Sequence, residues 1–135
     1  MNINTLTIKA QECLQQAFQI AANHNNQAVE PLHILASIIE DDDSLGAFLL
    51  GRAGVNVRGL RSEVQARLAR LPQVTGGGEQ YFAQESSKVI QRATDYTKNF
   101  GDKYASVEHL LLGLVADGGE TAKLLKQGGG SEKEL

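Results

Sequence analysis

Residues 29–35 read VEPLHIL and residues 106–112 read SVEHLLL, so the chain carries one histidine-centred apolar segment twice. A shift of 76 positions lays His33 on His109 and aligns the apolar residues that follow each histidine. The same shift relates three further pairs: Leu14 with Ile90, Ala17 with Ala93, and Leu6 with Phe82. A shift shorter by one aligns Ala47 with Ala122 and Leu49 with Leu124, across a connection that differs in length. Because apolar positions and helix-ending glycines recur at the same spacing in both halves, the sequence predicts a tandem duplication.

Working outward from these segments, apolar residues recur at intervals of three and four, which is the period of amphipathic helices. No stretch of four or more residues alternates as a strand would, so we expect an all-α fold. Thr7, Ser44 and Asn56 are expected N-caps, and Pro31 suits a first helical position. The expected helices cover about residues 8–23, 31–41, 45–53, 57–71, 84–99, 107–116 and 120–127.

The clustered glycines and the two prolines suggest the boundaries of the two repeats. We expect a first repeat at residues 1–72, a connecting loop at 73–82 and a second repeat at 83–128. Residues 129–135 are expected to begin a linker. A glycine triplet at 76–78 is interpreted as part of a flexible connection, because it lacks the strand, lysine and hydroxyl residue of a phosphate-binding loop.

Composition excludes several classes of protein. The chain has 135 residues, a net charge of −3 and one cysteine, so it is large enough for one domain and cannot form an internal disulfide. It shows neither a membrane span nor a leader peptide, and its slightly acidic balance argues against nucleic-acid binding. The sequence therefore favours a cytoplasmic protein without nucleic-acid or membrane partners.

No arrangement of residues points to catalysis or to metal binding. His33 and His109 each lie three positions after an expected helix start, where the imidazole can reach back to unpaired N–H groups. We expect this structural role for both, because no two histidines have the spacing of metal ligands. Cys13 is expected to be a core or boundary thiol.

Two groups of charged residues have simpler interpretations than a binding site. Residues 40–43 read EDDD but lack the alternate spacing of a calcium loop, so we expect a solvated turn. Five of the six arginines fall between residues 52 and 70, on the helix side opposite the apolar stripe. That side could face an acidic partner, but exposure to water is the favoured interpretation.

The duplicated segment, together with Leu6 and Thr7 before the first helix, resembles the Clp repeat at the amino ends of Clp/Hsp100 ATPases. Residues 53–56 (AGVN) and 70–74 (RLPQV), before the glycine-rich turn, are similar to the ClpB-type disaggregases within that family. The resemblance covers about residues 1–128 and implies a pseudo-twofold bundle of about eight helices.

The resemblance also implies a function and its partners. Such a domain engages unfolded or aggregated polypeptide for a hexameric parent, which threads it with help from the DnaK chaperone system. The domain itself is then no enzyme and needs no cofactor, while ATP and magnesium belong to ATPase modules outside this chain. The alternative is the adaptor- and substrate-binding N-domain of a protease-linked ClpA or ClpC unfoldase. A free-standing small enzyme is the weakest alternative.

The residues implied as substrate-binding follow from matching positions. The polar set consists of Thr7, Asp102 and Glu108, and the groove for apolar segments consists of Arg92, Tyr96 and His109. The groove positions are aliphatic in some relatives, so this groove is expected to be shallow and to use the apolar stem of an arginine. Ala83 departs from the usual Ser or Thr cap of the second repeat, so this helix start should fray or depend on a neighbour.

Overall fold

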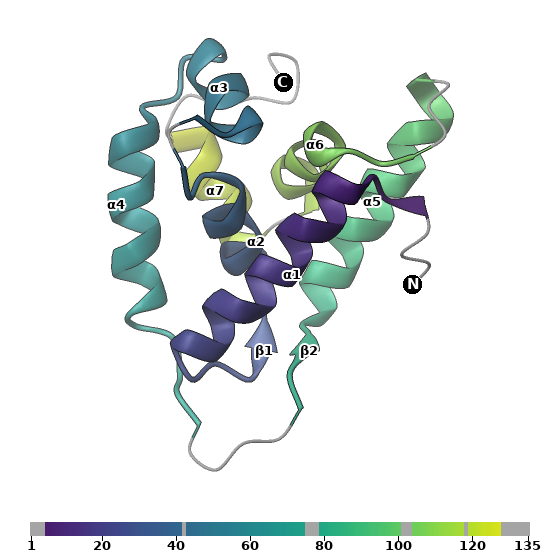
Figure 1. Ribbon diagram of the computed structural model, residues 1–135. Coiled ribbons are helices and arrows are strands. Elements are labelled where there is room, and N and C mark those ends of the chain that lie inside the picture. Colours follow the sequence, from purple (N-terminus) through teal and green to yellow (C-terminus); the bar gives the residue numbers. More distant parts are fainter. Residues whose placement is uncertain (1–4, 42, 75–78, 101–103, 118, 128–135) are drawn as a thin grey trace.

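The computed structural model shows a helical bundle with one short pair of parallel strands (Figure 1). It describes residues 5–41, 43–74, 79–100, 104–117 and 119–127, and of residues 98–100 only the backbone. The elements are α1 (Ile8–Asn23), β1 (Ala28–Val29), α2 (Pro31–Ile38), α3 (Leu45–Arg52), α4 (Val57–Leu68), β2 (Tyr81–Phe82), α5 (Gln84–Phe100), α6 (Val107–Asp117) and α7 (Glu120–Gln127). The all-α prediction is confirmed, and the seven helices in the described ranges lie close to their expected positions. The glycine triplet at 76–78 and the expected linker lie outside the described residues.

Helices α1, α3 and α4 begin at the capping residues that the sequence predicts. The three bonds are Thr7 Oγ1 to the N–H of Ala10 at 3.1 Å, Ser44 Oγ to the N–H of Ala47 at 3.1 Å, and Asn56 Oδ1 to the N–H of Gly59 at 3.2 Å. Each cap satisfies an N–H group that would otherwise lack a partner in the first turn. Pro31 occupies the first position of α2, where its missing N–H costs nothing.

Helix α2 is shorter than expected, and two side chains from later in the chain bond carbonyls at its end. The sequence predicted a helix running to about residue 41, but α2 ends at Ile38. Ser44 Oγ donates to the Ile38 carbonyl at 2.9 Å, and Arg61 Nε donates to the Ile39 carbonyl at 2.9 Å. Arg61 is therefore half-buried against α2, which corrects the interpretation that it lies with the other arginines in water.

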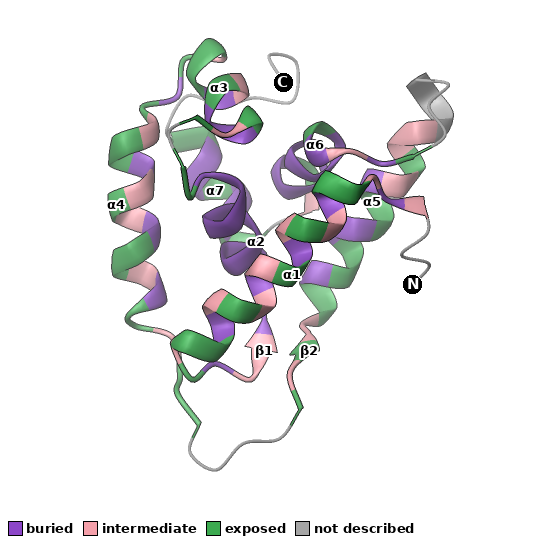
Figure 2. Ribbon diagram, in the orientation of Figure 1, coloured by how far each residue is buried: buried purple, intermediate pink, exposed green. Residues whose placement is uncertain are grey.

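Helices α2 and α6 form the centre of the bundle. All of α2 is buried, and α6 is buried from Val107 to Val115 except at Glu108 (Figure 2). A helix that is apolar on all sides needs partners on all sides. The other helices supply them, each turning a buried stripe inward and an exposed face outward, as the purple and green bands of Figure 2 show.

Two short backbone pairings join the halves and follow the 76-residue shift. Val29 in β1 pairs in parallel with Phe82 in β2, and Leu6 forms a parallel bridge with Ala105. These are equivalent pairs, because Leu6 corresponds to Phe82 and Val29 to Ala105 under that shift. In each half, therefore, the residues just before the first helix pair with the segment just before the second helix of the other half. These pairings were not predictable from the sequence, because two-residue strands carry no periodicity.

The two halves differ in how closely their first two helices approach. Between α1 and α2, Ser37 Oγ donates to the Cys13 carbonyl at 2.7 Å. The equivalent residues between α5 and α6 are Gly113 and Val89. A Cβ atom on Gly113 would lie 2.5 Å from the Val89 carbonyl oxygen. Helices α5 and α6 therefore contact at a point where only glycine fits.

Candidate binding surface

Thr7 and Glu108 lie at one end of the molecule, where α1 and α6 begin. The Thr7 N–H donates to the Ala105 carbonyl at 2.8 Å, and the Ala105 N–H donates to the Thr5 carbonyl at 2.7 Å. This backbone pairing fixes the first turn of α1 beside the segment that leads into α6. Thr7 uses its hydroxyl as the α1 cap, while Glu108 is exposed in the first turn of α6. Thr7 and Glu108 thus lie at the starts of two helices that are joined by backbone pairing, and Asp102 lies outside the described residues.

Two exposed apolar residues flank this pair, and the sequence analysis did not single them out. Ile8 follows Thr7 and is 74% exposed, and Tyr104 precedes Ala105 and is 53% exposed. The exposure of Ile8 could have been predicted, because Ile8 lies outside the apolar stripe of α1. Nothing in the sequence distinguished Tyr104 from any other loop residue.

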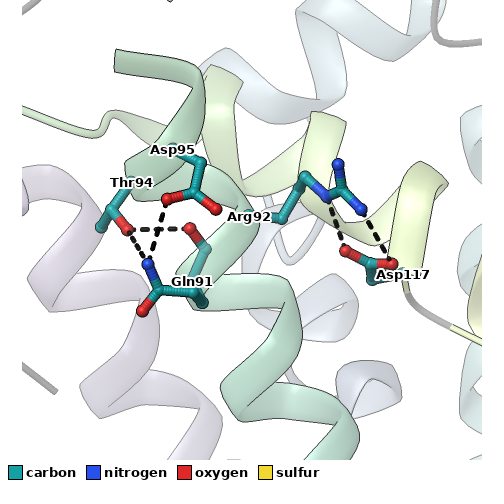
Figure 3. A network of polar contacts seen from close by, with 5 residues as sticks. All are labelled: Gln91, Arg92, Thr94, Asp95 and Asp117. Atoms are coloured by element: carbon teal, nitrogen blue, oxygen red, sulfur yellow. Dashed lines mark hydrogen bonds and ion pairs between the residues drawn. The ribbon is translucent and has the colours of Figure 1, made fainter. Parts of the chain in front are cut away.

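Arg92 and Tyr96 lie one turn apart on α5, so they share a face of that helix. Arg92 is exposed and paired, since its Nε donates to Asp117 Oδ2 at 2.7 Å (Figure 3). The hydrogen bonds and negative charge of Asp117 raise the pKa of the Arg92 guanidinium above its ordinary value. Tyr96 is half-buried. The charge of Arg92 is therefore paired at the C-terminal end of α6, and the apolar stem of Arg92 is the part that remains available to a ligand.

Gln91 starts a second polar network on the neighbouring face of α5. Its Nε2 donates to Asp95 Oδ1 at 3.1 Å and reaches Thr94 Oγ1 at 3.4 Å, as the dashed lines of Figure 3 show. Thr94 Oγ1 also donates to the Gln91 carbonyl at 2.8 Å. Figure 3 shows this network and the Arg92–Asp117 pair side by side along α5 with no bond between them.

His33 and His109 cap their helix starts, as the sequence predicted. The Glu30 N–H donates to His33 Nδ1 at 2.9 Å, and the Ser106 N–H donates to His109 Nδ1 at 2.9 Å. His109 is only 6% exposed, so the structure places this predicted groove residue beneath the surface that carries Glu108.

His33 also ties α2 to the segment that connects the two halves. Its Nε2 lies 2.9 Å from Asn26 Oδ1, and Asn26 Nδ2 donates to the Pro72 carbonyl at 3.0 Å. Burial lowers the pKa of His33 to about 4, with a smaller contribution from the nearby His24. A neutral imidazole fits this geometry, because Nδ1 accepts from Glu30 and Nε2 then carries the proton donated to Asn26.

The start of α5 is anchored by β1 instead of by a side-chain cap of its own. The Ala83 N–H donates to the Val29 carbonyl at 3.0 Å, and Ser86 Oγ donates to the same oxygen at 2.6 Å. Dependence on a neighbour was one of the two outcomes expected from an alanine at this position.

Among the described residues, no group of histidine, cysteine, aspartate and glutamate side chains could hold a metal ion. No helix in the same part of the chain is long and apolar enough to cross a membrane. Cys13 is half-buried, and burial raises the pKa of its thiol.

The comparisons with known proteins agree with each other. The family model of the Clp repeat (R) N-terminal domain matches residues 5–128. Among curated relatives, the chaperone protein ClpB of Porphyromonas gingivalis is 39% identical over 135 residues, and that of Bacteroides thetaiotaomicron is 38% identical over the same length. Both alignments cover 100% of this chain but 16% of the relative, so the chain spans about a sixth of the length of these proteins.

Solved structures share the fold at lower sequence identity. The N-terminal domain of Hsp104 from Candida albicans superposes with a TM-score of 0.83 at 22% identity, covering 96% of this chain and 85% of that one. The N-domain of ClpV from Vibrio cholerae gives a TM-score of 0.81 at 14% identity, covering 97% and 81% respectively.

Proposed function

We propose that this chain, which belongs to the family of Clp repeat (R) N-terminal domains of Clp-type chaperones, engages unfolded or aggregated polypeptide for a ClpB-type disaggregase. The support for a ClpB-type parent is the identity of 38–39% to ClpB chaperones over the whole chain. In this proposal ATP, magnesium and hydrolysis belong to modules of a hexameric parent outside this chain, and the DnaK system cooperates with that parent.

The observation that carries the proposal is the mixed surface where α1 and α6 begin. Exposed Ile8 and Tyr104 lie beside the polar groups of Thr7 and Glu108, while Tyr96 on α5 adds a half-buried ring. Apolar contacts of this kind suit the apolar segments that an unfolded chain offers. The polar groups can accept or donate hydrogen bonds to an extended backbone without requiring one sequence.

This surface predicts weak binding. His109 is buried and Arg92 is paired, so we expect the predicted groove to offer a shallow contact. We expect a dissociation constant of tens of micromolar or weaker, on the order of −6 kcal/mol. Weak binding serves the proposed task, because tethering raises the local concentration at the ring while the segment can still leave for threading.

An amide-shift titration with a permanently unfolded protein tests the proposal. Shifts should cluster around Thr7, Tyr96 and Glu108, and Tyr96→Asp should abolish them while the helical circular dichroism stays unchanged. Tyr81→Asp is the control, since Tyr81 is a tyrosine at a different place, exposed in β2 at the other pairing between the halves. Binding unaffected by Tyr96→Asp would remove this surface from the proposal, and no shifts at millimolar polypeptide would remove the function.

A further inference from the structure

A groove of about 510 Å³ lies along α1, and neither Tyr96 nor Arg92 lines it. Its walls are the first half of α1, the connection between α2 and α3, and the start of α6 at Val107. The volume falls within the range of about 300–1,000 Å³ that small-molecule and side-chain pockets occupy. Of the residues predicted from the sequence to bind substrate, none that the structure describes lines this groove.

The rim of the groove is strongly acidic. Four of its lining residues are carboxylates and one is a lysine, which gives the lining a formal charge of −3; these residues are Glu12, Glu40, Asp41, Asp43 and Lys9. Lys9 Nζ lies 3.9 Å from Glu12, and Gln16 Nε2 donates to Glu40 at 3.3 Å without neutralising it. Carboxylates gathered around a concave wall reinforce each other's potential and attract cations.

The floor and lip of the groove are apolar. Ile38 and Val107 are buried beneath it, and Leu45 lines it while remaining 50% exposed. Phe48, one turn further along α3, is also exposed, and the Arg52 guanidinium lies 5.9 Å from the centroid of its ring. Gly46 also lines the groove, where any side chain would run into Ile38, so α3 packs tightly against the end of α2.

The second half of the chain lacks this combination at the equivalent positions. Glu12 and Gln16 correspond to Lys88 and Arg92, and Arg92 neutralises Asp117, the counterpart of Asp41. Leu45 corresponds to Glu120 under the shorter shift. The pseudo-twofold fold alone therefore requires neither the acidic rim nor the exposed leucine, and both occur together only on the first half's side of α1.

We propose that this groove is a second polypeptide site, which takes an apolar side chain flanked by lysine or arginine. The apolar side chain lies against Leu45, Ile38 and Val107, and the flanking cations face the carboxylates of the rim. The inference rests on the proposed function, because unfolded polypeptide is the source of such segments. It adds a preference for flanking cations, because four carboxylates and one lysine line the groove.

Exposed carboxylates make this preference dependent on salt. Charges on a rim are screened over about 8 Å at physiological ionic strength, and each exposed pair changes affinity by about one- to five-fold. Binding to the groove should therefore weaken several-fold between 50 and 300 mM salt, whereas binding to the α1–α6 surface should change little.

The test compares two unstructured peptides of about twelve residues that carry the same leucines. In one the leucines are flanked by lysines, and in the other by glutamates. In amide-shift titrations the lysine peptide should shift the signals of Glu12, Glu40 and Leu45, and the glutamate peptide should not. The double variant Glu40→Gln/Asp41→Asn should raise the dissociation constant for the lysine peptide about three- to ten-fold, which two exposed charges can account for.

Controls separate this site from the α1–α6 surface. Glu85→Gln/Glu120→Gln removes the same charge on the other half and should leave the affinity unchanged. Tyr96→Asp should abolish binding of an unfolded protein at the α1–α6 surface but leave the lysine peptide bound. The inference is overturned if both peptides bind equally, if Tyr96→Asp abolishes both interactions, or if the shifts avoid Glu40 and Leu45. The proposed function is overturned separately, if unfolded protein shifts no residue of the α1–α6 surface.

Discussion

Replacing Gly113 by alanine should destabilise the fold, although alanine is the better helix former. Gly113 lies in the middle of α6, where a Cβ atom would stand 2.5 Å from the Val89 carbonyl oxygen and 3.3 Å from Val89 Cγ1. Carbon and oxygen atoms normally stay about 3.3 Å or more apart. Helices α5 and α6 must therefore separate locally by most of an ångström, because the obstructing atom belongs to the backbone and cannot rotate away.

The expected size follows from two opposing terms. Overpacking of this kind costs about 1–3 kcal/mol, and alanine recovers up to about 1 kcal/mol of helix propensity. We expect the upper part of the first range, since the contact is with backbone, and thus a net loss of about 1–2 kcal/mol. For a domain of this size that lowers the midpoint of thermal unfolding by roughly 4–8 °C.

Gly51→Ala is the matched control. Gly51 is helical, exposed and near the end of α3, and a Cβ atom there would meet nothing within 4 Å. The substitution should raise the free energy of unfolding by about 0.5 kcal/mol. Urea and thermal unfolding followed by circular dichroism measure both variants. If Gly113→Ala proved as stable as the parent, or changed in the same direction as Gly51→Ala, the close approach of α5 and α6 would be refuted.

Three further predictions concern His33, Ala83 and Asp117. The pKa of His33 is lowered to about 4 in the fold, so its contribution to stability is complete above the unfolded value near 6.5 and is lost as pH falls towards 4. From pH 7 to pH 5 the loss should be about 2 kcal/mol in urea unfolding, and a His33→Gln variant that keeps the same pH dependence would contradict this. Ala83→Ser should supply the missing cap of α5 and raise the free energy of unfolding by about 0.5–1 kcal/mol; a neutral result would mean that the bond to Val29 already suffices. Asp117→Asn should change unfolding by less than about 1 kcal/mol despite the short distance to Arg92, because exposed ion pairs contribute little, and a larger loss would show that the pair holds α5 to α6.

The sequence predicted features that depend on local chemistry. Helix caps such as Thr7 and Ser44 follow from the residue types beside each apolar stripe, and the structure confirms them. The capping role of His33 and His109 was also accessible, because both histidines hold the same place relative to a helix start. The boundaries assigned to the two repeats remain predictions.

Features that depend on contacts between distant segments were not predictable. Arg61 was placed in water because its helix position lies off the apolar stripe, yet the shortened α2 leaves a carbonyl that its Nε reaches. The close approach at Gly113 depends on the spacing of two helices, which no residue in α6 encodes alone. For the candidate surface, sequence matching named Thr7 and Glu108, whereas the exposure of Ile8 and Tyr104 required the fold.

The pseudo-twofold relation also separates the positions that the fold constrains from the positions that differ between the two halves. Positions that the fold constrains keep their chemistry in both halves, as His33 and His109 do. Positions that face solvent diverge: Ile8 corresponds to Gln84, and Tyr104 corresponds to Ala28. Ile8 and Tyr104 are thus exposed apolar residues near the pairing of Leu6 with Ala105, whereas their counterparts near the pairing of Val29 with Phe82 are Gln84 and Ala28, and the exposed apolar residue there is Tyr81. Two copies of one fold would offer two equivalent surfaces, and the different residues at these positions are the reason to propose the surface where α1 and α6 begin and not its counterpart.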